Sequence, residues 1–146
     1  MATTTLGGNT ERVDGKKIVR ATLIGAVLAA VVNAVLWAIM RLVLALPMVI
    51  QMGGPASPTQ PLGIVPVVVA TIIPAIGAGV LLALLGRFTR RPYTIFLILS
   101  AVFLLLSFLS PLSLPGDLPV KLAFEVLHIG AAAAIVWALV TQTRAS

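Results

Sequence analysis

Three residues in the last apolar stretch of the chain carry side chains that can take part in chemistry inside a membrane: Lys121, Glu125 and His128. Their spacing of i, i+4 and i+7 places them on one face of a helix. Ionisable groups are costly in hydrocarbon, and they commonly mark ligand sites or proton pathways. Histidine is the side chain whose charge most readily changes near neutral pH, so His128 is the natural titrating group of this set.

A second polar stripe lies in the first apolar stretch, where Asn33, Trp37 and Arg41 recur at i, i+4 and i+8. At the rise of an α-helix, Asn33 lies roughly 12 Å and His128 roughly 13 Å below the same outer surface. Thr71, in the second apolar stretch, has a similar depth. We therefore expect Asn33, Thr71 and His128 to share one polar layer.

Two interpretations of these residues remain open. In the first, they line a small chamber that binds a ligand or relays protons, with Glu125 turned toward Arg41 or Lys121 and Asn33 meeting His128. In the second, they are a structural hydrogen-bond layer that sets the register of the helices, and single contacts of this kind average under about 1 kcal/mol in membranes. Both interpretations predict that Asn33 and His128 face the interior of the bundle, because an unpaired polar group in hydrocarbon is costly.

The sequence predicts neither a metal site nor an enzyme. Glu125 and His128 form one Glu-x-x-His pair, whereas di-iron helical bundles take such pairs from two helices and further glutamates from two others. The chain has no cysteine, and we find no nucleophile elbow and no phosphate-binding glycine loop in it. We therefore expect no metal, no cofactor and no catalytic residue.

Four apolar stretches must position these polar residues, and each is long enough, or nearly so, to cross about 30 Å of hydrocarbon. Of the 146 residues, 60% are hydrophobic and only 10% are charged, whereas soluble domains carry about 25% charged residues. We predict an all-α integral membrane four-helix bundle in up-down-up-down order, with spans at about 21–41, 62–86, 93–110 and 119–141. Residues 47–61, rich in Pro, Gly and Ser, are predicted to be an irregular outer loop.

Basic residues in short loops predict the orientation of the bundle, because they favour the cytoplasmic side. Only Arg41 and Lys121 flank the spans on one side. The other side, which carries both termini, is therefore predicted to be cytoplasmic. Residues 1–15 are polar and are predicted to be a disordered cytoplasmic tail, followed by one transmembrane domain over residues 16–146. The basic residues that flank the spans on the predicted cytoplasmic side are Lys16, Lys17, Arg20, Arg87, Arg90, Arg91 and Arg144.

Small residues at a spacing of four predict the faces along which the helices pack, since close approach of backbones drives helix association in lipid. The third stretch contains mostly Leu, Ile and Phe, so we expect it to show the most surface to lipid. The small and polar residues that form such stripes are Gly25, Ala29 and Asn33, then Ala75 and Gly79, then Gly130 and Ala134.

Four features of the chain occur together in a known group of proteins. They are Asn33 ahead of Trp37, the basic turn 87–92 (Arg-Phe-Thr-Arg-Arg-Pro), the segment 107–112 (Ser-Phe-Leu-Ser-Pro-Leu), and His128 ahead of an Ala-rich run. In their order and spacing, from about Arg20 to Ala138, the chain resembles a family of small four-span bacterial membrane proteins described only as a domain of unknown function. The resemblance implies no activity, substrate or cofactor. Glu125 and Lys121 do not belong to its pattern.

These observations lead to one functional prediction and one alternative. With tiny loops and no catalytic constellation, the chain is predicted to be a non-enzymatic accessory or assembly subunit that acts through helix–helix contacts. The alternative is a small carrier or a ligand- or proton-binding protein that uses the layer around Asn33 and His128. Its expected location is the bacterial cytoplasmic (inner) membrane, in contact with lipid and with a larger complex or further copies of itself. Basic charge without a recognition module excludes nucleic acid as a partner.

Overall fold

The protein consists of four long apolar helices packed together, and the computed structural model describes residues 11–51, 57–113 and 117–144. Each of the four helical stretches Gly15–Val43, Ile64–Phe88, Pro92–Ser113 and Leu118–Gln142 is long and apolar enough to cross a membrane. The prediction of an all-α, multi-pass membrane protein is therefore confirmed. In chain order the elements are α1 (Gly15–Ala38), the π-helical turn η1 (Ile39–Val43), β1 (Val49–Gln51), β2 (Thr59–Pro61), α2 (Ile64–Phe88), α3 (Pro92–Ser107), α4 (Leu109–Ser113) and α5 (Leu118–Gln142).

The helix boundaries reflect local chemistry as well as hydropathy. Helix α1 begins six residues before the predicted span, because the carboxylate of Asp14 accepts a hydrogen bond from the backbone N–H of Lys16 (3.0 Å) and caps the helix. Helix α2 continues through Pro74, as membrane helices can, because neighbouring helices and local adjustments satisfy the backbone groups that a proline frees. The predicted third span is divided at Phe108 into α3 and the short α4.

A two-stranded antiparallel hairpin occupies part of the region that we predicted to be an irregular loop. In it, β1 pairs with β2, with Val49 opposite Pro61 and Gln51 opposite Thr59. Backbone pairing satisfies polar groups close to the membrane, where water is scarce. Beneath the hairpin, Met48 is fully buried and fills the core between α1, α2 and α5.

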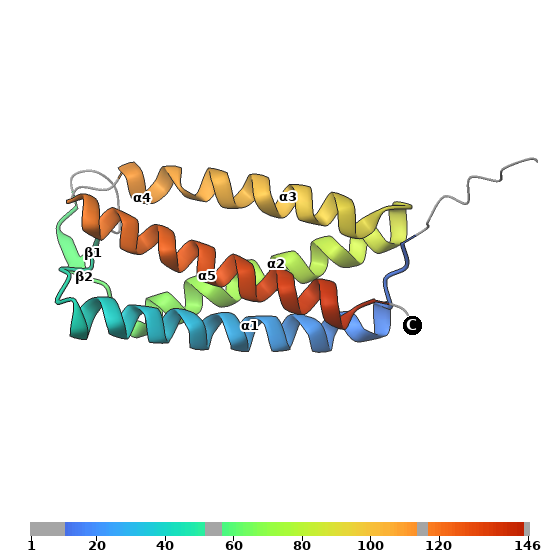
Figure 1. The fold of residues 1–146 in the computed structure, drawn as a ribbon, viewed down its shortest axis with the longest axis horizontal. Coiled ribbons are helices and arrows are strands. Elements are labelled where there is room, and N and C mark those ends of the chain that lie inside the picture. Colours follow the sequence, from blue (N-terminus) through green and yellow to red (C-terminus); the bar gives the residue numbers. More distant parts are fainter. Residues whose placement is uncertain (1–10, 52–56, 114–116, 145–146) are drawn as a thin grey trace, which may run out of the picture.

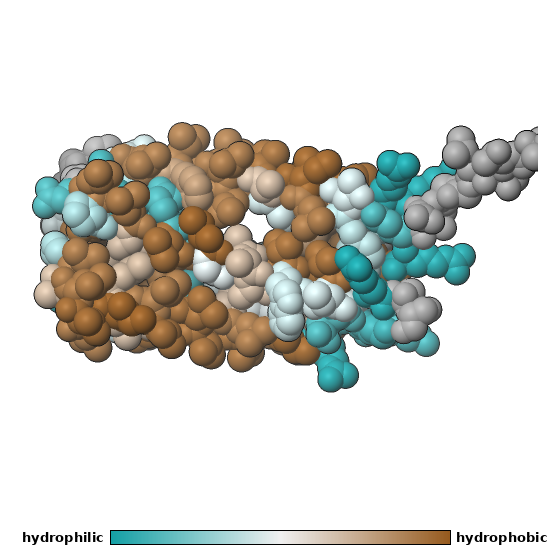
Figure 2. Space-filling model, viewed as in Figure 1, coloured by the Kyte–Doolittle hydropathy of each residue, from teal (hydrophilic) through white to brown (hydrophobic). Residues whose placement is uncertain are grey.

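The start of α1 and the end of α5 lie at the same end of the bundle, since the N–H of Asp14 donates to the carbonyl of Thr143 at 2.9 Å. The turn between α2 and α3 lies there as well (Figure 1). We call this the basic end, because most of the Lys and Arg residues belong to it, and the opposite one the hairpin end. Figure 2 shows hydrophilic residues gathered at the basic end and a broad hydrophobic surface over the middle of the bundle. Such a surface is suited to lipid contact.

Helix α1 makes the most extensive contacts in the bundle, with α5 and α2, and α3 lies on the far side from it. Small residues permit the close approach: Gly25 of α1 faces Ala138 of α5, and Gly79 of α2 faces Thr22 of α1. The predicted packing stripes are therefore confirmed at these positions.

Helix α3 is the most exposed to the surroundings of the bundle. In the most apolar stretch of the span formed by α3 and α4, 11% of residues are buried, whereas 28–39% are buried in the corresponding stretches of the other three spans. Its own buried residues, Pro92, Tyr93 and Phe96, all lie in the first two turns at the basic end. The third span thus shows the most exposed surface of the four, which fits the prediction that it faces lipid.

Candidate functional site

Glu125 carries a buried carboxyl group that has no hydrogen-bond partner among the residues that the structure describes. The residue is 8% exposed, and neither Oε1 nor Oε2 meets a donor among the described residues. It lies in α5, about 12 Å along the helix from Asp117 at its start. An ionised carboxylate in such a place, without compensation, is among the most costly arrangements in a membrane protein.

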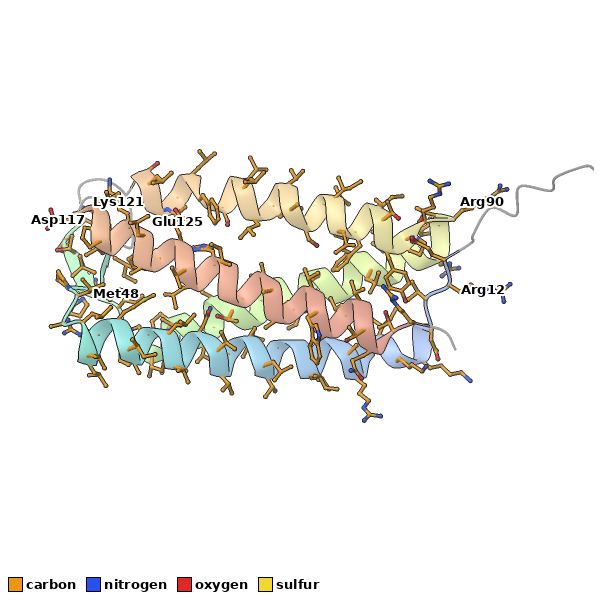
Figure 3. The ribbon with its side chains drawn as sticks, in the orientation of Figure 1. Arg12, Met48, Arg90, Asp117, Lys121 and Glu125 are labelled. Carbon is orange, nitrogen blue, oxygen red and sulfur yellow. The ribbon has the colours of Figure 1, made fainter. Side chains whose placement is uncertain are left out.

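Glu125 lies on the side of α5 that faces α3 and α4. Lys121, one turn earlier on the same face, donates from Nζ to the carbonyl of Leu112 in α4 at 3.0 Å. Figure 3 shows Lys121 and Glu125 on the side of α5 toward these two helices. We call this contact surface between α5 and α3/α4 the α5 seam, and Glu125 is its buried acidic group.

His128 follows Glu125 by three residues, which places it on the same side of α5. Its side chain is partly buried, and Nδ1 lies 2.7 Å from the carbonyl oxygen of Phe124 in its own helix. The helical spacing thus places Glu125 and His128 on the same side of α5, along the α5 seam.

Asn33 and Thr71 form a separate buried contact between α1 and α2. The Nδ2 of Asn33 donates to Oγ1 of Thr71 at 2.9 Å, and this hydroxyl donates to the carbonyl of Val67 at 2.8 Å. Both residues are buried, at 5% and 3% exposed. The prediction that Asn33 points inward at the depth of Thr71 is confirmed, and the contact fits the structural interpretation of the polar layer.

The predicted meeting of Asn33 with His128 is wrong. Gly130 is the residue of α5 that faces Asn33, since a Cβ placed on Gly130 would lie 3.3 Å from the Oδ1 of Asn33. His128 precedes Gly130 by two residues, so it points about 160° away around the helix. Asn33 and His128 therefore lie on opposite sides of α5, and equal depth did not bring them together.

The predicted pairing of Glu125 with Arg41 or Lys121 is also wrong. Arg41 is exposed in η1, and its Nη1 reaches the carbonyl of Leu46 at 3.5 Å. The ammonium of Lys121 is directed to α4, as described above. Both cations satisfy backbone carbonyls near the hairpin end, where such carbonyls lack helical partners. Glu125 is left without a Lys or Arg partner in the described part of the chain.

Trp37, the middle residue of the predicted stripe of Asn33, Trp37 and Arg41, also makes a hydrogen bond. Its indole Nε1 donates to the carbonyl of Leu62, just before α2, at 2.9 Å. Together with the Asn33–Thr71 contact one turn away, this hydrogen bond joins α1 to α2 twice. Asn33 and Trp37 therefore both direct their side-chain donors from α1 toward α2 and the residue just before it.

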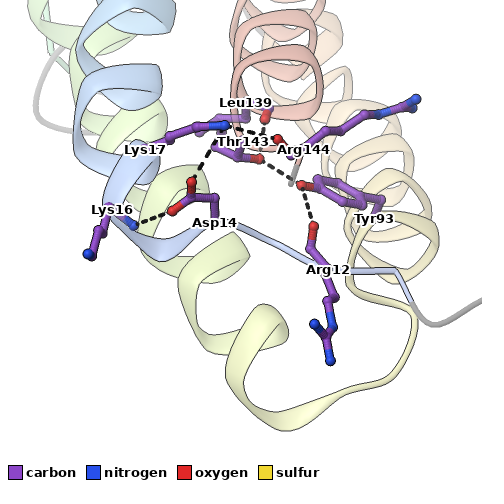
Figure 4. A network of polar contacts seen from close by, with 8 residues as sticks. All are labelled: Arg12, Asp14, Lys16, Lys17, Tyr93, Leu139, Thr143 and Arg144. Atoms are coloured by element: carbon purple, nitrogen blue, oxygen red, sulfur yellow. Dashed lines mark hydrogen bonds and ion pairs between the residues drawn. The ribbon is translucent and has the colours of Figure 1, made fainter. Parts of the chain in front are cut away.

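A polar network at the basic end was not anticipated from the sequence. Residues 11–14, which we expected to belong to a disordered tail, contact the ends of the other helices; residues 1–10 of that tail lie outside the described residues. Val13 forms a β-bridge with Arg144. The hydroxyl of Tyr93 in α3 lies 3.4 Å from the carbonyl of Arg12 and 3.1 Å from Oγ1 of Thr143 (Figure 4). The N-terminal segment 11–14 thus joins the start of α3 to the end of α5.

Glu11 caps α3 from a distant part of the sequence. Its Oε2 accepts hydrogen bonds from the backbone N–H groups of Tyr93 (2.8 Å) and Thr94 (3.2 Å), and its Oε1 accepts one from the Thr94 hydroxyl (2.8 Å). The Thr94 hydroxyl, these backbone donors and the charge of Arg91 hold the pKa of Glu11 below its ordinary value, while desolvation acts in the opposite direction. Helix α3 gains from this the cap that its preceding residue, Arg91, does not supply. The one local signal for order here was Asp14, a typical capping residue ahead of the first helix.

Comparison with known proteins places the chain by its sequence. Searches of curated proteins and of solved structures each find no match. A model of a protein family, described as "Family of unknown function (DUF6069)", matches residues 13–145 and so covers nearly the whole chain. This confirms the resemblance to a family of unknown function, and the chain belongs to the family DUF6069.

Proposed function

We propose that this protein is a small proton-binding membrane protein, and that the carboxyl group of Glu125 is its proton site. The observation that supports the proposal is the burial of both carboxyl oxygens without a partner among the described residues. A neutral carboxyl group, with a proton held on one oxygen, removes the cost of an isolated charge in this place. Intramembrane acids of this kind are typical of proton relays in carriers.

The positive partner of Glu125 must come from outside the chain's Lys and Arg residues. All ten Lys and Arg residues of the sequence lie in the described part of the chain. Lys121 and Arg41 are the two near the hairpin end, and both are directed to backbone carbonyls. A proton is the smallest cation able to reach a carboxyl group that other side chains cover.

We further propose that the basic end faces the cytoplasm of a bacterial cell and that the hairpin end faces outward. The support is the distribution of the ten Lys and Arg residues, because eight of them belong to the basic end and two lie near the hairpin end. In this orientation, Glu125 lies in the outer half of the membrane. Protons would therefore enter the α5 seam from the hairpin end.

Infrared spectroscopy tests the proton site directly. We expect the protein in lipid nanodiscs to show a protonated-carboxyl C=O band at the high frequency of a carbonyl that accepts no hydrogen bond. The band should rise and fall reversibly as the pH is cycled, and should be lost in Glu125→Gln. Asp117→Asn is the matched control, because Asp117 is exposed at the start of the same helix and makes no cap hydrogen bond. A spectrum in which Glu125→Gln removes only a band at the frequency of a hydrated acid would refute the proposal.

A second candidate function is that of an accessory subunit held in a larger complex by helix–helix contacts. The observation that favours it is the low burial of α3, whose middle and later turns contribute no buried residue. Lipid covers such a surface equally well, so purification decides between the two. A fixed-stoichiometry complex in mild detergent would support this role if it is disrupted by a bulky substitution on α3, Ile98→Trp, but not by Ile73→Trp on α2; both residues are exposed.

A further inference from the structure

The geometry of the α5 seam points to His128 as the residue that exchanges a proton with Glu125. We propose that the Nε2 of His128 accepts the proton that Glu125 releases, and returns it. This inference rests on the proposed function and adds a second group to the site, so that the proton can move between two residues of one helix face.

The hydrogen bond of His128 determines which ring nitrogen is available. The carbonyl of Phe124 has no hydrogen to give, so the Nδ1 of His128, 2.7 Å away, must be the donor. In a neutral imidazole only one nitrogen carries hydrogen. The Nε2 therefore has a free lone pair, and it can accept a proton without breaking the contact to Phe124.

The spacing of the two residues suits a transfer between them. Side chains at i and i+3 on a helix are neighbours, with Cβ atoms about 5–6 Å apart. His128 lies about 4.5 Å further along α5 from the hairpin end than Glu125 does. A proton that passes from Glu125 to His128 therefore moves deeper into the bundle.

Among the described residues around the pair, no other acidic or histidine side chain lies in the seam. Lys121, one turn before Glu125, is the other ionisable residue on this face of α5, and its ammonium donates to Leu112. Helices α3 and α4 contain no acidic, basic or histidine residue, and the hydroxyl of Ser107 donates to its own helix at Leu104. The ionisable residues of α1, η1 and α2 lie near their ends: Lys16, Lys17, Arg20, Arg41 and Arg87.

The transfer step balances without any further reactant. The O–H bond of the Glu125 carboxyl group breaks, and an N–H bond forms at Nε2 of His128. The products are a carboxylate and an imidazolium on adjacent turns of the same face. Their charges sum to zero and attract each other, so the step avoids the isolated charge that a proton lost to water would leave behind.

Time-resolved infrared spectroscopy after a rapid pH jump tests the relay. We expect the carboxyl band of Glu125 to persist in His128→Gln but to decay at least about tenfold more slowly than in the native protein, since a positioned acid–base group typically contributes a factor of this size or more. Asn33→Ala is the control, because Asn33 lies on the opposite side of α5 and should leave the decay rate unchanged.

The two proposals fail in different ways. If the Glu125 band is present but decays at the native rate in His128→Gln, the relay is wrong while the proton site stands. If the band is absent from the native protein, the proton site itself is wrong. Nitrogen NMR of the native protein adds a test that needs no variant, because His128 is the only histidine in the chain. A neutral tautomer with hydrogen on Nε2 would overturn the relay.

Discussion

The Nδ2 of Asn33 donates to the Oγ1 of Thr71 at 2.9 Å, and this contact joins α1 to α2 in the buried interior of the bundle. We expect Asn33→Ala and Thr71→Ala each to destabilise the protein, since each removes the hydrogen bond that joins the two helices, and Thr71→Ala also leaves the buried Nδ2 of Asn33 without its acceptor. The double variant should lose less than the sum of the two, with a coupling energy of about 0.6 kcal/mol, the average for such contacts in a membrane. Reversible unfolding in mixed micelles measures the free energy of unfolding of the native protein, the two single variants and the double variant. Thr141→Ala, at an exposed residue of α5, should show no coupling to Asn33→Ala.

Two of the glycines of α2, Gly77 and Gly79, should respond in opposite ways to alanine. A Cβ at Gly79 would collide with the side chain of Thr22, lying 3.0 Å from its Cγ2, whereas a Cβ at Gly77 meets nothing within 4 Å. We expect Gly79→Ala to cost about 1–3 kcal/mol, because overpacking separates α1 from α2. Gly77→Ala should be neutral or stabilising by up to about 1 kcal/mol, since it removes backbone freedom from the unfolded chain.

Thermal unfolding of Gly77→Ala and Gly79→Ala measures this difference in stability, and a second substitution, at Thr22, tests its cause. Thr22→Ala removes the two Thr22 atoms that the new methyl group would approach most closely, Oγ1 and Cγ2, so it should recover most of the stability lost in Gly79→Ala. Equal melting temperatures for Gly77→Ala and Gly79→Ala would show that α1 and α2 do not pack as closely as described.

The cap that Glu11 places on α3 should make stability depend on pH in an acidic range. The pKa of Glu11 is lowered in the folded protein, so its contribution is fully present above the ordinary glutamate value of 4.5 and is lost as the pH falls through the lowered folded value. We expect Glu11→Gln to melt at a lower temperature than the native protein at neutral pH. The difference should shrink as the solution is acidified below that ordinary value. Asp117→Asn, which removes an acid at the opposite end, should show no such convergence.

Reporter fusions test the orientation of the bundle. Fusions after Ser146 and within residues 86–92 should report the cytoplasm, and fusions at Ser57 or Gly116 the outside. The same side reported at Ser57 and within 86–92 would contradict a membrane-spanning α2. A complete inversion, with Ser57 cytoplasmic, would leave the bundle intact but would place Glu125 in the inner half of the membrane.

The helices could be predicted from the sequence because their apolar runs are long and each run is bounded by segments that contain prolines, glycines or charged residues. The close contacts of Gly25 and Gly79 followed from the four-residue spacing of small residues. Rotation of α5 about its own axis could not be predicted in the same way. Asn33 and His128 have matching depths, yet the face of α5 that contacts α1 carries Gly130. Rotating α5 to bring His128 to that face would move residues of α5 that are now buried out of the core. The depth of a residue in the membrane follows from counting residues along its helix, whereas the direction in which its side chain points depends on how all four helices pack.

The N-terminal segment escaped prediction for a different reason. Its contacts are hydrogen bonds made by Glu11 and Asp14 and a β-bridge made by Val13, all to residues more than 70 positions away. Hydropathy does not register such contacts, and a short polar stretch before a span resembles any solvated tail. The unpaired state of Glu125 was also beyond reach, because Lys121 and Glu125 are well spaced for a salt bridge within α5, and only the position of α4 explains why the lysine is directed elsewhere.

The bridge between Val13 and Arg144 has a consequence for the order of events during synthesis. The ribosome makes Val13 more than a hundred residues before it makes Arg144, so this part of the chain has to wait for its partner through the insertion of all four helices. Contacts between such distant positions form late and slow the final step of assembly. Closure of the basic end therefore marks the completion of the bundle, and a chain that stops short of Thr143 lacks the residues that hold the first helix, the third helix and the last one together.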